Sequence, residues 1–140
     1  MVQLEIRIQA ERQNVESALD HLDEALARKP RTMVELAAIG TFLHNFYGGV
    51  ENIAKQVLLE HEKKVPMSGS WHKDLLEATV DEGILTRALA DELYEYLAFR
   101  HFFVHGYGHT LREKELEPLS KSARKVWKKF LGEISSTTNV

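Results

Sequence analysis

The sequence has no cysteine, and it has only three prolines among 140 residues. Without cysteine, the chain cannot form disulfides, thiolate nucleophiles or cysteine-based zinc sites. It also lacks an apolar run of membrane-spanning length, and its first residues do not form a signal-peptide pattern, so we expect a cytoplasmic protein without a membrane partner. A basic excess is missing too. The formal net charge of -3 argues against broad, nonspecific binding of nucleic acid.

The hydrophobic residues predict an all-α protein. They make up 44% of the chain, which is ordinary for a globular protein, and we expect one domain over residues 1–140. Nearly every segment repeats its apolar residues with the period of a helix, and no segment shows a β-strand pattern. The predicted fold is an antiparallel helical bundle of about four long helices plus a short one.

Capping and breaking residues predict where the helices begin and end. A first helix covers residues 4–26 and ends before Pro30, because proline disfavours helix in the residue before it. Thr32 and Glu35 predict a capping box at the start of a second helix. Gly48 and Gly49 lie in the middle of that helix and indicate either a kink or a close contact between helices. We favour the close contact.

The second half of the chain predicts three further helices. A short helix covers residues 71–80, and a longer one runs from about Thr86. Gly106 and Gly108 suit the end of that longer helix. A last helix opens at Pro118, since proline is well tolerated at the first helical position. We expect the aromatic residues Phe99, Phe102 and Phe103 to be core residues, whatever the function.

Residues 99–107, with the sequence FRHFFVHGY, carry the side chains that are best suited to chemistry. Arg100, His105 and Tyr107 form an R-x4-H-x-Y pattern, with His101 directly after the arginine. The planar, permanently charged guanidinium of arginine fits phosphate oxygens. Histidine can give and take a proton near neutral pH. The pattern therefore indicates a site that grips or cuts a phosphodiester.

Two other groups of charged or histidine residues are weaker candidates for a functional site. His101, His105 and His109 could form a metal-binding stripe, but no carboxylate lies at an equivalent helical offset, and we expect no metal and no cofactor. The late basic cluster of Lys121, Arg124, Lys125, Lys128 and Lys129 is better explained as a solvated helix face.

Helical geometry does not bring Arg100 and His105 onto one face, because residues five apart differ by roughly 140° around a helix. Helical spacing pairs His101 with His105 and does not by itself select Arg100.

Beyond the spacing, the chain resembles HEPN-domain ribonucleases, and most closely the HepT-type toxins of HEPN–MNT toxin–antitoxin pairs. The resemblance rests on the R-x4-H-x-Y pattern and on three stretches, residues 45–53 (NFYGGVENI), 70–76 (SWHKDLL) and 96–103 (YLAFRHFF). It covers most of the chain. Val104 departs from the pattern, because relatives often carry arginine at this position.

The resemblance implies a homodimeric, metal-independent endoribonuclease that cleaves RNA where the motifs of two subunits meet. Arg100 and His105 would be the catalytic residues, while His101 and Tyr107 would support them or contact RNA. The implied partner is an MNT-type nucleotidyltransferase antitoxin that silences the toxin by transferring AMP to Tyr107. The alternative is a non-catalytic HEPN module that binds a nucleotide or a partner protein, which the acidic net charge and Val104 favour.

Overall fold

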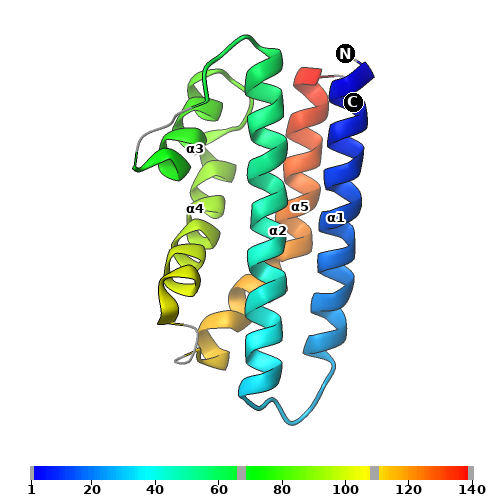
Figure 1. Ribbon diagram of the computed structural model, residues 1–140, viewed down its shortest axis with the longest axis vertical. Coiled ribbons are helices and arrows are strands. Elements are labelled where there is room, and N and C mark those ends of the chain that lie inside the picture. The colour runs from blue at the N-terminus through cyan, green and yellow to red at the C-terminus, as the bar shows by residue number, and fades with distance from the viewer. Residues whose placement is uncertain (1, 66–68, 108–110, 139–140) are drawn as a thin grey trace.

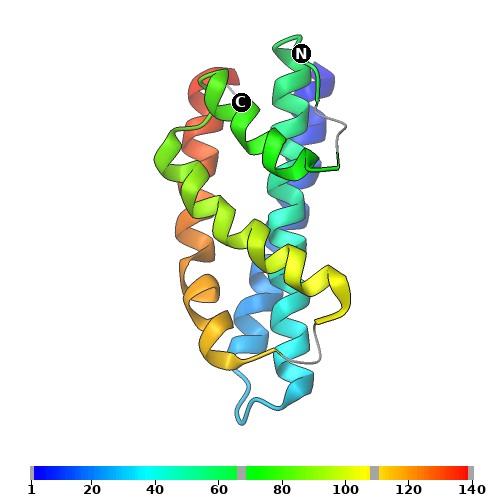
Figure 2. The same cartoon turned by 90° about the vertical axis from the view of Figure 1, so that its left-hand side faces the viewer.

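The computed structural model describes residues 2–65, 69–107 and 111–138, and within these ranges the chain is helical without strands. Three long helices, α1 (Val2–Leu26), α2 (Met33–Glu60) and α5 (Glu113–Thr138), lie side by side along the molecule (Figure 1). The shorter α3 (Trp71–Asp81) and α4 (Arg87–Phe102) pack on the other side of α2, and α4 crosses the bundle obliquely (Figure 2). The predicted all-α bundle is therefore confirmed. Within the described residues, no helix combines the length and the hydrophobicity needed to cross a bilayer.

The capping box predicted for α2 is present. The Thr32 backbone N–H donates to Glu35 Oε1 over 2.7 Å, and the Val34 N–H donates to Thr32 Oγ1 over 3.2 Å. These bonds satisfy backbone groups that have no partner inside the helix. The Thr32 side chain and backbone hold the pKa of Glu35 below its usual value, so this carboxylate is ionised near the positive end of the helix dipole.

The core is built around the inner face of α2. The apolar residues that recur along this helix with helical period are all buried, namely Leu36, Ile39, Leu43, Phe46, Tyr47, Val50, Ile53, Ala54, Val57 and Leu58. Phe46 lies at the centre, with the Tyr96 ring of α4 and the Trp127 ring of α5 meeting it edge-on at centroid distances of 5.3 and 6.4 Å. One aromatic cluster thus joins three helices. Glu51 is the exception on this face, because a charged residue is buried there.

The close contact predicted at Gly48 and Gly49 exists at one of them. A Cβ added to Gly49 would lie only 2.2 Å from Val15 Cγ2 of α1, whereas a Cβ added to Gly48 would meet nothing within 4 Å. Gly49 therefore allows α1 and α2 to approach closely, and Gly48 has no such role.

Alanine substitutions at these two glycines should have opposite effects on stability. Gly49→Ala should lower the free energy of unfolding by about 1–3 kcal/mol, because the methyl group forces α1 and α2 apart. Gly48→Ala should raise it by about 0.5–1 kcal/mol, because alanine loses less backbone entropy in a helix and has open space here. Urea unfolding followed by circular dichroism measures both. Equal shifts in the same direction would show that helix propensity, and not the contact with Val15, governs both positions.

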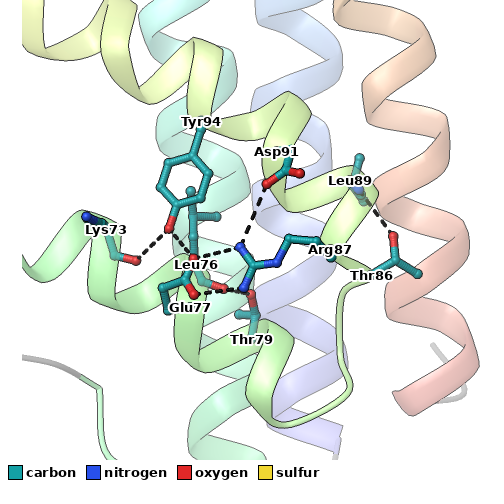
Figure 3. Close-up of polar contacts among 9 residues, drawn as sticks. All are labelled: Lys73, Leu76, Glu77, Thr79, Thr86, Arg87, Leu89, Asp91 and Tyr94. Carbon is teal, nitrogen blue, oxygen red and sulfur yellow. Dashed lines mark hydrogen bonds and ion pairs between the residues drawn. The ribbon is translucent and has the colours of Figure 1, made fainter.

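A polar network ties α3 to α4 (Figure 3). The Arg87 guanidinium donates two hydrogen bonds to the Glu77 carboxylate, at 2.9 and 2.8 Å, and the Tyr94 hydroxyl donates a third. Arg87 and then Tyr94 lower the pKa of Glu77 to about 2, so the carboxylate is ionised at physiological pH. Two helices that are separated by a turn at Gly83, where φ is 74°, are thereby held in one relative position.

The start of α5 differs from the prediction. The helix begins at Glu113, and Pro118 lies inside it rather than at its first position. The preceding turn is held by an ion pair between Arg31 and Glu113 and by burial of Leu116. Because proline lacks an N–H and its ring displaces the carbonyl four residues earlier, it bends a helix. In Figure 1 the first turns of α5 lie at an angle to the rest of the helix.

The basic residues of α5 face solvent and acidic neighbours. Arg124 donates to both Asp20 and Asp23 of α1 at 2.8 Å, and Lys129 lies 2.9 Å from Glu92 of α4. Lys121 pairs with Glu117 one turn earlier on the same helix. These contacts support the interpretation of the cluster as a solvated helix face.

Candidate functional site

The R-x4-H-x-Y segment lies where α4 ends. Arg100 and His101 belong to the last turn of α4, and residues Phe103–Tyr107 follow as a short segment, η1, in which His105 and Gly106 leave the helical conformation. Gly106 has φ 84°, a left-handed conformation that glycine adopts without the steric cost of a Cβ. The predicted helix end at Gly106 is confirmed, while Gly108 lies outside the described residues.

The structure pairs the two histidines of the segment. The rings of His101 and His105 lie 4.3 Å apart between centroids, at an interplanar angle of 47°. Both side chains are exposed, and Arg100 is half-buried. Helical spacing predicts this pairing of His101 with His105. His101 thus lies between the two proposed catalytic residues in the chain and contacts one of them.

Two residues singled out by the sequence cannot be placed in the site. The side chain of Tyr107 and the whole of His109 lie outside the described part of the chain. Among the residues that are described, no three histidine, aspartate or glutamate side chains gather as a metal ion would require. Val104, the departure from the family pattern, is 44% exposed and presents an apolar surface beside His105 in the chain.

The sequence predicts that the phenylalanines of the segment belong to the core, but the structure places them at its edge. Phe99, Phe102 and Phe103 are all half-buried. Phe103 stacks on Phe99 at 5.5 Å and meets the His44 ring of α2 at 5.8 Å. Gly40 makes room for it, since a Cβ there would lie 2.8 Å from Phe103 Cε1. The aromatic side chains therefore anchor η1 on α2 while the polar side chains between them stay accessible.

Arg100 and His101 face a groove between α4 and the first turn of α3. The groove has a volume of about 430 Å³, and His72, Lys73 and Tyr94 also line it. Leu97 is half-buried and forms part of this wall. The network of Glu77, Arg87 and Tyr94 holds the two walls together (Figure 3).

The charge of Arg100 acts on α2 as well as on the groove. Burial and then the Arg100 guanidinium lower the pKa of His44, which keeps this imidazole neutral at physiological pH. Burial and then the Glu51 carboxylate raise the pKa of the Tyr47 hydroxyl, and Arg100 partly opposes that rise. The Tyr47 hydroxyl lies close enough to Glu51 to respond to its charge, but it makes no hydrogen bond of standard geometry. Arg100 is therefore part of a polar cluster that reaches into the bundle.

Sequence reasoning missed the pair of Glu51 and His72. His72 Nδ1 lies 2.9 and 2.8 Å from the two carboxylate oxygens of Glu51, which is only 4% exposed. The sequence assigns no partner to His21, His44, His61 or His72. The signal available was a glutamate on the otherwise apolar inner face of the second helix, because a buried carboxylate needs a partner.

Comparison with known proteins finds a match between this chain and one protein family. No curated protein and no solved structure matches the chain. The match to the family described as HepT-like protein covers residues 38–139, which includes most of α2, all of α3 and α4, and the R-x4-H-x-Y segment. The match extends over well over half of the sequence and agrees with the all-helical fold. The chain therefore belongs to the HepT-like protein family.

Proposed function

We propose that this protein is the toxin of a HEPN–MNT toxin–antitoxin pair and that it cleaves RNA as a homodimer without a metal ion. The observation that carries the proposal is the contact of the exposed His101 and His105 rings directly beyond Arg100. A guanidinium and two imidazoles in one accessible segment supply a fixed positive charge and groups that exchange protons near neutral pH. Membership of the HepT-like family favours the same chemistry.

RNA brings its own nucleophile to the reaction. One His105 imidazole takes the proton of the 2′-hydroxyl, and the 2′-oxygen forms a bond to phosphorus. The bond between phosphorus and the 5′-oxygen breaks, and that oxygen receives a proton from a second imidazolium. The products are a 2′,3′-cyclic phosphate and a 5′-hydroxyl, and the reaction consumes neither an oxidant nor a water molecule.

The two proton transfers explain why a dimer would be needed. One His105 acts as the base, and the His105 of a second subunit acts as the acid. Arg100 stabilises the additional negative charge that builds up on the phosphate oxygens in the transition state. His101, whose ring lies against that of His105, orients the catalytic imidazole or binds a neighbouring phosphate.

The proposed partner is an MNT-type nucleotidyltransferase that regulates the toxin. It transfers AMP from ATP to the Tyr107 hydroxyl, with formation of a phosphodiester bond to the tyrosine oxygen and release of pyrophosphate. The modification brings bulk and negative charge next to a site that binds phosphate, and both would exclude RNA.

Chelation and removal of the 2′-hydroxyl should separate this mechanism from a metal-dependent one. Cleavage of a fluorescent RNA oligonucleotide should proceed at an unchanged rate in EDTA, because no step uses a metal. The same oligonucleotide made as DNA should remain intact, because it lacks the internal nucleophile. Gel electrophoresis with detection of the cyclic phosphate end checks both.

The matched control is an RNA with a single 2′-deoxy substitution at the mapped cleavage position. Loss of cutting at that position alone supports attack by the 2′-oxygen. Strong inhibition by EDTA would contradict the proposal and favour a metal site instead. An intact RNA under all conditions, with no growth defect on expression, would identify the non-catalytic module as the correct alternative.

A further inference from the structure

The groove that Arg100 and His101 share with α3 has an unusual charge for this protein. The whole chain is acidic, with 21 Asp and Glu against 18 Lys and Arg. Among the described residues that line the groove, however, four are basic and none is acidic: His72, Lys73, Arg100 and His101. The basic side chains come from two helices that the Glu77 network fixes in position. Such a lining selects an anion, and its volume of about 430 Å³ admits more than one phosphate-sized group.

His72 is the residue of this lining whose orientation is best defined. Its Nδ1 lies 2.8 and 2.9 Å from the two oxygens of the Glu51 carboxylate, which is 4% exposed. An ionised carboxylate only accepts hydrogen bonds, so Nδ1 carries a proton and donates it. The His72 ring also lies against the Trp71 ring, at 3.5 Å between centroids. Lys55 Nζ lies over the Trp71 ring, 3.9 Å from its centroid. Nε2 is therefore the nitrogen that remains for a ligand in the groove.

Glu51 and His72 fix each other's position at the edge of the groove. A buried carboxylate without a partner is costly, so His72 and Glu51 hold each other in place. His72 can thus present Nε2 to a ligand without rearrangement of its side chain, and the protonated ring donates from Nε2 to a phosphate oxygen.

We propose that His72, held by Glu51, is a further RNA-binding residue and that the groove binds a phosphate of the strand next to the scissile one. This inference rests on the proposed function and specifies where the substrate lies. Arg100 borders both the groove and the histidine segment, so an RNA backbone that passes from His105 to His72 crosses it. His72 contacts RNA but takes no part in bond cleavage.

Binding of a non-cleavable RNA tests the role of His72 separately from catalysis. A fluorescent 2′-O-methyl oligonucleotide has no free nucleophile, and its anisotropy gives Kd for the full-length protein. His72→Ala should raise Kd by about tenfold, the value of one charge-assisted hydrogen bond. With cleavable RNA, KM should rise similarly while kcat stays within about threefold, because His72 does not act in the chemical step.

A matched control and a direct spectroscopic readout exclude a merely structural role. His61 also faces a glutamate, Glu82, at 3.6 Å, but the pair lies where α2 and α3 end and not in the groove. His61→Ala should leave Kd and KM unchanged. In nitrogen NMR, the Nε2 signal of His72 should shift when the oligonucleotide is added to the wild-type protein, and the His61 signals should not. Glu51→Gln should weaken binding in the same direction as His72→Ala.

The outcomes distinguish this inference from the proposed function. If the wild-type protein cuts RNA while His72→Ala retains its Kd and KM and the Nε2 signal does not move, the role of His72 is refuted and the ribonuclease stands. If His72→Ala lowers kcat but not affinity, the residue acts in the chemical step and the binding role is wrong. A wild-type protein that neither binds nor cuts RNA overturns both.

Discussion

His105→Ala should lower the rate of RNA cleavage by about 10²–10⁴-fold, the contribution of a positioned general acid or base. The side chain is exposed and lies at a turn, so its removal should leave the fold intact. Arg100→Ala should have a comparable effect through loss of charge stabilisation in the transition state. Initial rates on a fluorescent RNA, together with circular dichroism and the unfolding midpoint of each variant, measure the two effects.

The control for the His105→Ala and Arg100→Ala variants is His21→Ala. His21 is an exposed histidine of α1 that stacks on Phe42 at 5.3 Å, and its removal should leave cleavage unchanged. Mixed dimers with one His105→Ala subunit add a sharper test. If one imidazole is the base and the other the acid, these dimers should be nearly as inactive as the double variant. Half of the wild-type rate would instead show that each subunit cleaves on its own.

Phe46→Ala should lower the free energy of unfolding by about 3–5 kcal/mol, the usual cost of removing a large core aromatic side chain. Phe46 is fully buried and contacts Tyr96 and Trp127, so its loss opens a cavity between α2, α4 and α5. Urea unfolding gives the change directly. Because α4 carries Arg100 and His101, cleavage should also fall at temperatures near the new unfolding midpoint.

Leu59→Ala on the same helix is the matched control. Leu59 is 53% exposed, so its truncation should change stability by less than about 0.5 kcal/mol. A small effect of Phe46→Ala, similar to that of Leu59→Ala, would mean that the aromatic cluster does not hold α2 against α4 and α5.

The sequence predicts the fold well because local signals suffice for it. The capping box at Thr32, the buried face of α2 and the helix end at Gly106 all depend on residues a few positions apart. The start of α5 fails for the opposite reason. Pro118 looks like a helix opener in isolation, but a tertiary ion pair between Arg31 and Glu113 and burial of Leu116 stabilise the turn before it.

The candidate site is less accessible to sequence reasoning because its parts come from distant segments. Spacing predicts the His101–His105 contact, since residues four positions apart share a helix face and η1 follows directly on α4. It cannot predict that His72 meets Glu51, 21 positions earlier, or that the α3 residue Lys73 faces the same groove as Arg100. Such contacts follow from how α3 packs on α2 and α4. The catalytic roles of Arg100 and His105 and the modification of Tyr107 remain predictions.

The bidentate pairing of Arg87 with Glu77, reinforced by Tyr94, has a kinetic consequence. Because folding already fixes α3 against α4, these two walls of the groove need little rearrangement to meet an arriving anion. Association with the groove should then be limited by diffusion and by the long-range attraction of the fixed charges of Lys73 and Arg100. Capture would accordingly be fast and would slow steeply as ionic strength rises.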